Sequence, residues 1–131
     1  MKLSATVITL NEQANLDKCL TSLNGWVDEI VVVDSGSTDE TVLIAKKHGA
    51  KVVTHHFSNF ADQKNYAMNQ AMGEWVLSVD ADEEIPENLA SEIRNVIEIG
   101  KHDGYLIGRR NFILGDEIRY SRWSPDRHIW L

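Results

Sequence analysis

Four short segments rich in β-branched and aliphatic residues recur along this 131-residue chain, and the intervals between them have helical periodicity. The segments cover residues 3–10, 29–34, 51–55 and 75–79. Each interval is long enough for the crossover helix that two parallel neighbouring strands require. The apolar run from Ile30 to Val33 is typical of a strand covered on both faces. The pattern therefore predicts an α/β fold with a mainly parallel sheet, helices on both faces and right-handed crossovers.

Local start and stop signals predict where the helices lie. Asn11 is expected to cap a helix from Glu12 to about Asn24, and Ser37 with Glu40 forms a capping box for a helix to about His48. Gly49 is expected to end that second helix. Two more helices are predicted, one from about Asn59 to Met72 and one from Pro86 to Gly100, with Leu89, Ile93, Val96 and Ile97 on its buried face.

The last segment differs from the rest in pattern and in charge. The chain carries a net charge of −7, made of −9 over residues 1–100 and +2 over residues 101–131. Short strands at 105–107 and 112–114, followed by a turn at Gly115-Asp116, predict a C-terminal antiparallel hairpin. This segment interleaves five arginines with aromatic side chains, which suits an anionic sugar acceptor or a negatively charged membrane surface. An amphipathic hairpin with a basic outer face explains the same pattern without a ligand.

Composition limits the functional classes. The acidic balance disfavours broad nucleic-acid binding, which needs a positive field. The single Cys19 excludes an internal disulfide and, on a helical apolar stripe, is expected to be a buried structural thiol. The longest aliphatic run has four residues, and Met1-Lys2-Leu3 leads directly into a strand without a signal-peptide pattern. We therefore expect a soluble cytoplasmic protein, with peripheral contact at the inner face of the cytoplasmic membrane as an option for the basic segment.

The residues just after each strand are the place to look for chemistry, since ligands of open parallel sheets bind at the carboxyl ends of the strands. The strongest pattern is Asp80-Ala81-Asp82, in which extended-chain alternation puts both carboxylates on one side. Two hard oxygen donors at this spacing suit Mg²⁺ or Mn²⁺, and such an ion would neutralise charge on a departing diphosphate. A solvated acidic loop before a helix is the alternative.

Three further polar positions each have two interpretations. Asp34 ends an apolar strand and would either bind a base or ribose or form an Asx turn into Ser35-Gly36, which we favour on pattern alone. Asn11 has a capping role that needs no ligand. Lys64 lies on a helical stripe with apolar residues, so its ammonium either reaches solvent or meets an anion, such as a nucleotide phosphate or the acids at the sheet edge.

Taken in order, these motifs resemble the family 2 glycosyltransferases with the GT-A fold. The resemblance lies in Val7-Ile8-Thr9-Leu10-Asn11-Glu12, in Val31-Val32-Val33-Asp34-Ser35-Gly36-Ser37-Thr38-Asp39 and in Asp80-Ala81-Asp82-Glu83. Gln63-Lys64-Asn65 and Trp123-Ser124-Pro125-Asp126-Arg127 are similar to the bacterial subgroup that adds glucose or a similar sugar to the lipopolysaccharide or lipooligosaccharide core. The match covers essentially the whole chain.

The resemblance implies an inverting transfer from a nucleotide-sugar, most often a UDP-sugar, to a saccharide or lipid-linked acceptor. Asn11, Glu12 and Asp34 match positions lining the nucleoside pocket. Asp80 and Asp82 match the D-x-D motif that holds ribose and the metal–diphosphate, with Mn²⁺ or Mg²⁺ as the cofactor. Lys64 falls where a basic residue often approaches the nucleotide.

This chain departs from the family pattern in two ways. Ser35 stands where many relatives carry a second acid, which leaves the base preference open. Relatives also continue for about as many residues again, so the resemblance implies C-terminal truncation. Residues 1–100 are then the nucleotide-sugar-binding portion, and 101–131 begin the acceptor side of the same domain.

The general base is expected beyond Leu131, because an inverting transferase needs a group to take the acceptor proton. Glu83 and Asp126 are the only candidates within the chain, and poor ones. A catalytically incomplete nucleotide-binding fragment is the alternative function. A sugar-phosphate nucleotidyltransferase is disfavoured, because Val7 to Leu16 lacks the glycines and basic residues of a phosphate loop.

Overall fold

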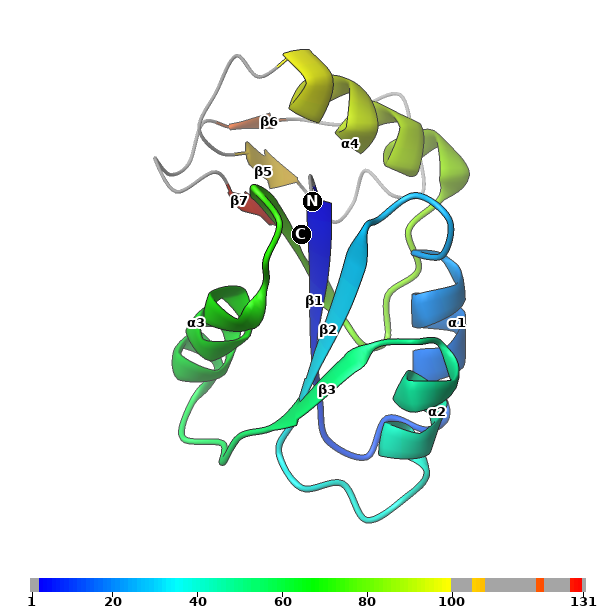
Figure 1. Ribbon diagram of the computed structural model, residues 1–131, viewed down its shortest axis with the longest axis vertical. Coiled ribbons are helices and arrows are strands. Elements are labelled where there is room, and N and C mark those ends of the chain that lie inside the picture. The colour runs from blue at the N-terminus through cyan, green and yellow to red at the C-terminus, as the bar shows by residue number, and fades with distance from the viewer. Residues whose placement is uncertain (1–2, 100–104, 108–119, 122–127, 131) are drawn as a thin grey trace.

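The computed structural model describes residues 3–99, 105–107, 120–121 and 128–130 (Figure 1). Its centre is a parallel sheet of four strands. They are β1 (Leu3–Thr9), β2 (Glu29–Asp34), β3 (Lys51–Thr54) and β4 (Trp75–Asp80). Their spatial order is β3-β2-β1-β4, so consecutive strands cross over through helices. The mainly parallel sheet predicted from the strand spacing is confirmed.

Three short strands extend this sheet beyond β4. They are β5 (Tyr105–Ile107), β6 (Tyr120–Ser121) and β7 (His128–Trp130). β7 pairs parallel with β4 and with β5, while β5 pairs antiparallel with β6. The predicted hairpin with its strand at 112–114 and its turn at Gly115-Asp116 lies outside the described residues.

Helices cover both faces of the sheet, as the sequence pattern predicts (Figure 1). α3 (Phe60–Gln70) packs on one face against β1 and β2. The opposite face carries α1 (Leu16–Thr21), α2 (Thr41–Lys47) and α4 (Glu87–Ile99), and its core includes Leu16, Leu20, Ala45, Leu89, Ile93 and Ile97. The buried face predicted for α4 is confirmed at the three residues whose side chains are described; Val96 and Gly100 lie outside that description.

The central strands divide their side chains between two cores by alternation. Ala5 and Val7 of β1 and Val32 of β2 point into the larger core under α1, α2 and α4. Val31 and Val33 point to the smaller core under α3. Because both faces are buried, β2 carries the continuous apolar run that the sequence shows.

Two predicted helix starts are wrong. α1 begins at Leu16 rather than Glu12, and Asn11 adopts a left-handed backbone with φ of 54° instead of capping it. At α2 no Ser37–Glu40 capping box forms; an Asp39 Oδ1 atom accepts from the Thr41 N–H at 2.9 Å instead. Asn11 Oδ1 accepts from the Thr38 N–H and Ser37 Oγ accepts from the Asn11 N–H, so both side chains bond across the two loops instead of capping a helix.

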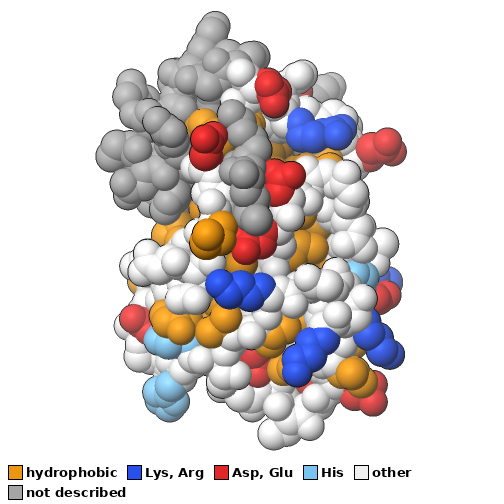
Figure 2. Space-filling view, viewed as in Figure 1, with side chains coloured by type: hydrophobic (Ala, Val, Ile, Leu, Met, Phe, Trp, Pro, Cys, Tyr) orange, Lys and Arg blue, Asp and Glu red, His pale blue; other side chains and the backbone are white. Residues whose placement is uncertain are grey.

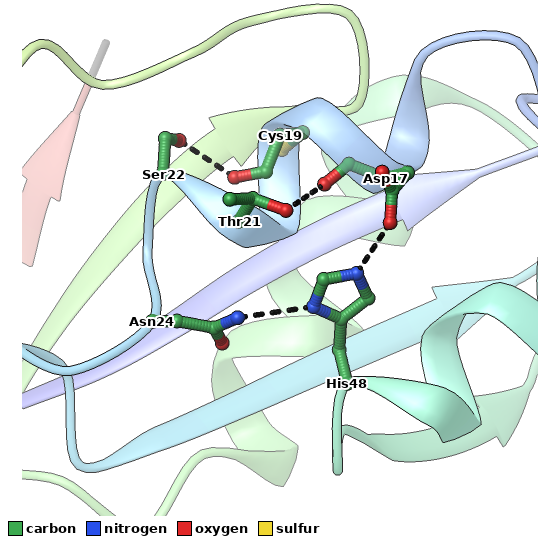
Figure 3. Close-up of polar contacts among 6 residues, drawn as sticks. All are labelled: Asp17, Cys19, Thr21, Ser22, Asn24 and His48. Atoms are coloured by element: carbon green, nitrogen blue, oxygen red, sulfur yellow. Dashed lines mark hydrogen bonds and ion pairs between the residues drawn. The ribbon is translucent and has the colours of Figure 1, made fainter.

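One histidine at the end of α2 contacts a residue of α1 and a residue just after that helix. Figure 3 shows His48 between Asp17 and Asn24: its Nε2 lies 2.8 Å from Asp17 Oδ1 and its Nδ1 lies 3.1 Å from Asn24 Nδ2. Gly49 follows with φ of 76°, as its predicted role in ending the helix requires. The contact fixes the two helices side by side behind the sheet.

The outer surface mixes charges of both signs with hydrophobic side chains, and Figure 2 shows this intermixing on one face. In the described part of the chain, no helix is long and apolar enough to cross a membrane.

Candidate functional site

Two adjoining pockets lie at the carboxyl edge of the central sheet, between the ends of β1 and β4 and the helix α3. One, of about 330 Å³, is lined by Thr9, Leu10, Ser35, Phe57 and Gln63; the other, of about 350 Å³, is lined by Lys64, Asp80, Ala81 and Asp82. Ile8, Glu12 and Phe60 line both. We call the two together the edge groove. Its volume is in the range of small-molecule sites, and it lies where parallel sheets bind ligands.

A larger pocket of about 530 Å³ lies at the opposite edge of the sheet. Its walls come from the start of β1, the loop at Trp26 and the end of α4. The strand-end acids singled out from the sequence line the edge groove instead, so the edge groove is the better candidate for chemistry.

The polar half of the edge groove is built on a tight turn after β4. The Asp80 carbonyl accepts from the Glu83 N–H at 2.9 Å, and the Asp80 N–H donates to Glu83 Oε1 at 3.0 Å. Ala81 is buried, Asp80 is half-buried and Asp82 is exposed. The extended segment predicted for these residues is not formed, because residues 80–83 make a turn; Asp80 and Asp82 nevertheless line the same pocket. Glu83, a candidate base from the sequence, has its carboxylate committed to this turn.

Cys19 supports the same turn from inside the core. Its Sγ lies 3.5 Å from the Asp80 carbonyl oxygen, and its side chain is fully buried, as predicted. Burial, followed by the negative charges of Glu83, Asp80 and Asp82, raises the pKa of the Cys19 thiol to about 12. The thiol is therefore structural.

Lys64 is the one cation among the described residues that line the edge groove. Its Nζ lies 3.8 Å from Asp80 Oδ1, and both side chains are about a quarter exposed. The sequence left two options for this ammonium, solvent or an anion. The structure shows it beside an acid of the sheet edge, Asp80. With Glu12, Asp80 and Asp82 against one lysine, the groove is acidic overall and attracts cations.

The donor set of the groove fits a hard divalent ion that keeps part of its shell for other ligands. Asp80 and Asp82 supply carboxylate oxygens, the ligands that Mg²⁺ and Mn²⁺ prefer. No group of three His, Cys, Asp or Glu side chains able to hold a metal occurs in the described residues. A two-carboxylate site of this kind leaves positions for water and for phosphate oxygens of a ligand.

Asp34 forms the Asx turn that the sequence favours. Its Oδ2 accepts from the N–H groups of Gly36 (3.0 Å) and Ser37 (2.8 Å), and its Oδ1 accepts from the hydroxyls of Thr9 (2.7 Å) and Ser37 (2.5 Å). Burial alone would raise the pKa of this carboxyl, but the hydrogen bonds from Ser37, Thr9 and Gly36 together hold it below its usual value. Four bonds fill the acceptor sites of a carboxylate.

Asn11 and Glu12 leave β1 together but face different ways. Asn11 Oδ1 accepts from the Thr38 N–H at 2.8 Å, so its side chain joins the β1–α1 loop to the β2–α2 loop. Glu12 lines both halves of the edge groove, and its N–H donates to Thr41 Oγ1 at 2.8 Å. The fold thus brings Glu12, Lys64, Asp80 and Asp82 together, while Asn11 and Asp34 brace the loops beside them.

Sequence reasoning missed the aromatic wall of the groove. Phe57 and Phe60 meet edge-to-face at 5.1 Å between ring centroids, and Phe60 is 68% exposed. The Phe57-x-x-Phe60 spacing before α3 was the available signal. Of the apolar stripe predicted around Lys64, Ala67 is buried but Phe60 is exposed. The stripe omits Gln63, which is buried with its amide bonded to both the ring and the carbonyl of His55.

Most of the basic and aromatic residues predicted to face an acceptor lie outside the described residues. They are Arg109, Arg110, Phe112, Arg119, Arg122, Trp123 and Arg127, while Tyr105, Tyr120 and Trp130 of the same set lie in β5, β6 and β7. Asp126, the other candidate base from the sequence, also lies outside the described residues.

Comparison with known proteins gives one family. The model described as Glycosyl transferase family 2 matches residues 4–129. An uncharacterized glycosyltransferase of Rickettsia felis is 41% identical over 105 residues, which is 80% of this chain and 37% of the relative. The lipopolysaccharide core biosynthesis glycosyltransferase LpsC of Rhizobium meliloti is 32% identical over 88% of this chain and 44% of its own length.

Solved structures agree with these relatives. S. aureus TarS in complex with UDP matches 82% of this chain and 35% of its own, at 30% identity and a TM-score of 0.66. Glucosyl-3-phosphoglycerate synthase from Mycobacterium tuberculosis, in complex with Mn²⁺, UDP and glucosyl-3-phosphoglycerate, matches 63% of this chain and 35% of its own, at 26% identity and a TM-score of 0.55. The chain thus has GT-A-like neighbours and spans about a third of their length.

Proposed function

The chain belongs to glycosyl transferase family 2, and on that premise we propose that it serves an inverting transfer of a sugar from a nucleotide-diphosphate donor, a UDP-sugar, to a saccharide or lipid-linked acceptor. One observation carries the proposal: Glu12, Lys64, Asp80 and Asp82 come from three separate elements and line one groove at the carboxyl edge of the sheet. The UDP complex of TarS, a relative at 30% identity, supports the choice of nucleotide.

Each half of the edge groove is assigned to one part of the donor. Phe57, Phe60 and Leu10 form the apolar half, which suits the flat faces of a base and ribose. Glu12 stands at the junction, where its carboxylate accepts from donor hydroxyl or N–H groups. Lys64, half-buried beside Asp80, is placed to pair with a phosphate oxygen. Asn11 and Asp34 belong to the nucleoside side by holding its loops.

Asp80 and Asp82 are proposed to hold Mn²⁺ or Mg²⁺, with Asp80 also near the ribose. Such an ion, when bound, neutralises the charge that builds on the departing diphosphate. The Mn²⁺ and UDP found together in the mycobacterial synthase support this choice. The net acidity of the groove gives it a physical basis, because a diphosphate entering beside three carboxylates is repelled unless a cation offsets them.

The acceptor side is proposed to begin within residues 101–131, with a lipopolysaccharide-core saccharide as the acceptor class. The LpsC relative, whose name states that role, supports it. The basic and aromatic composition of this segment also suits an anionic saccharide and peripheral contact with a membrane surface. The general base is proposed to lie beyond Leu131, since Glu83 is committed to the turn after β4.

The proposal is tested by nucleotide binding and turnover with matched variants. Calorimetry should detect UDP binding that depends on Mn²⁺, and Asp82→Ala should abolish that dependence. Glu84→Ala removes a neighbouring acid of the same loop and should leave binding unchanged. Release of UDP from a UDP-sugar without any divalent ion would contradict the assignment of Asp80 and Asp82.

An alternative is a nucleotide-binding portion that does not turn over by itself. The observation that favours it is length, since this chain covers 37% of its Rickettsia relative. Mn²⁺-dependent UDP binding without UDP release from any UDP-sugar, with a saccharide acceptor present, would select it.

A further inference from the structure

The two loops that border the edge groove are joined by reciprocal hydrogen bonds. From the first loop, the N–H groups of Asn11 and Gln13 donate to Ser37 Oγ (2.8 Å) and Asp39 Oδ2 (3.2 Å). From the second loop, the N–H groups of Thr38 and Glu40 donate to Asn11 Oδ1 (2.8 Å) and Gln13 Oε1 (3.0 Å). We call this set the loop clasp. It fixes the β1–α1 loop against the start of α2.

Thr41 is the buried centre of the loop clasp. Its side chain is fully buried, and its Oγ1 accepts from the Glu12 N–H at 2.8 Å. The same hydroxyl donates to Asp39 Oδ1, so its proton is committed and its lone pair faces Glu12. A carboxylate acceptor strengthens and orients such a bond. The hydroxyl therefore holds the backbone of Glu12 in one place.

Glu12 is the residue that this anchoring serves. Its side chain lines both pockets of the edge groove, at the junction between the apolar half and the acidic half. A flexible three-carbon side chain reaches a defined point only when its backbone is fixed. Asn11, directly before it, adopts a left-handed backbone with φ of 54°.

We infer that Thr41 is a positioning residue for nucleotide recognition, acting through the backbone of Glu12 on the nucleoside part of the donor. This inference rests on the proposed function of the edge groove. Thr41 lines neither pocket of the edge groove; its hydroxyl accepts from the Glu12 N–H and donates to the Asp39 carboxylate. Its effect on binding must therefore disappear when the Glu12 carboxylate is absent.

A double-mutant cycle separates this role from a purely structural one. Thr41→Val keeps the shape and removes the hydroxyl, Thr41→Ser keeps the hydroxyl, and Glu12→Ala removes the carboxylate. UDP affinity with Mn²⁺ is measured by calorimetry, and the melting temperature of each variant is recorded beside it. Thr21→Val is the control, because the Thr21 hydroxyl also donates a hydrogen bond, to the Asp17 carbonyl at 2.7 Å (Figure 3). Thr21 does not line the edge groove.

Thr41→Val should weaken UDP binding by about tenfold, since it orphans the Glu12 N–H and frees the loop. Thr41→Ser and Thr21→Val should stay within about twofold of the parent, and so should Thr41→Val when added to Glu12→Ala. If Thr41→Val fails to fold, Asp39→Asn, which removes the charge that orients the hydroxyl, replaces it in the same cycle.

The outcomes are distinct. UDP binding that is lost equally with and without Glu12, in proportion to the fall in melting temperature, would make Thr41 a structural residue only and overturn the inference. UDP binding that is insensitive to Glu12→Ala would overturn the inference and leave the proposed function standing. A parent chain that binds no UDP in the presence of Mn²⁺ would overturn both.

Discussion

Replacing Asp34 by Asn tests whether one buried carboxylate holds the loop beside the edge groove. The side chain is 2% exposed and accepts four hydrogen bonds, two from backbone N–H groups and two from hydroxyls. Asn has the same shape but only one oxygen. Its NH₂ group must therefore face one of the two pairs of donors that the carboxylate now satisfies.

The expected loss follows from this count. Hydrogen bonds to a charged acceptor are each worth roughly 1.5–3 kcal/mol, so losing two gives about 3–6 kcal/mol as an upper bound. The hydroxyls of Thr9 and Ser37 can rotate and accept from the new amide, which recovers roughly 1 kcal/mol for each bond. We therefore expect Asp34→Asn to lower the free energy of unfolding by about 2 kcal/mol at pH 7, in a domain whose total is about 5–15 kcal/mol.

The pH dependence supplies a second signature. The pKa of Asp34 is lowered in the folded state, so its stabilisation is complete above the unfolded-state pKa and is lost as the pH falls through the folded one. Asn does not titrate, so the gap between parent and variant should be widest near neutral pH and should narrow progressively as the pH falls below about 4.

Urea unfolding followed by tryptophan fluorescence, repeated from about pH 3 to 7, measures both quantities. Asp34→Ala is the companion variant and should cost more than Asn, because it leaves the two N–H groups without an acceptor. A cost below about 0.5 kcal/mol at neutral pH, or a gap that is the same at every pH, would refute the reasoning.

Three other outcomes are expected. Lys64→Met should weaken UDP binding by about 10- to 100-fold, because Lys64 is the cation among the described residues that line the edge groove. Lys47→Met, on the exposed side of α2, should have no effect, and equal behaviour of the two variants in calorimetry would remove Lys64 from the site. Gly73→Ala should lower the free energy of unfolding by about 1–3 kcal/mol in urea titration, because a Cβ there would lie 2.7 Å from the backbone nitrogen of Ser4. An unchanged free energy would show that the backbone of β1 shifts to make room for the Cβ. Cys19 should resist an aromatic disulfide reagent at pH 8 until urea unfolds the chain, since a pKa of about 12 leaves about one thiol in ten thousand ionised even where the reagent can reach it; rapid reaction of the folded chain would contradict its burial.

Most of the site's polar groove could be located from the sequence. The strand spacing placed Asp80 and Asp82 at a carboxyl edge, and the structure brings both to one pocket through a turn rather than through strand alternation. The helical stripe placed Cys19 inside the core and left Lys64 in need of an anion. These predictions succeeded because each depends on a short period of the chain, two residues in a strand or three to four in a helix.

The aromatic wall and the loop clasp could not be found in this way. From the sequence, Phe57 is an ordinary residue before a helix and Phe60 belongs to that helix's apolar stripe; the fold places both beside Ile8 in the edge groove. Asn11 and Ser37 carry the signals of local helix caps, and the structure uses both for bonds across 26 or 27 positions of the chain. A capping rule compares a residue only with its near neighbours and has no information about such partners.

The sequence by itself therefore determined the layered α/β architecture, the acidic edge and the family resemblance, because these follow from periodicity and from ordered motifs. Only the tertiary structure decided which of the edge residues face the groove. A short polar side chain bonds to whichever donor or acceptor lies within about 3 Å, and that distance is set by how β1 and β2 pair in register. This pairing brings the Thr41 hydroxyl to the Glu12 N–H and the Thr9 hydroxyl to the Asp34 carboxylate. Glu12, Lys64, Asp80 and Asp82 then line the edge groove.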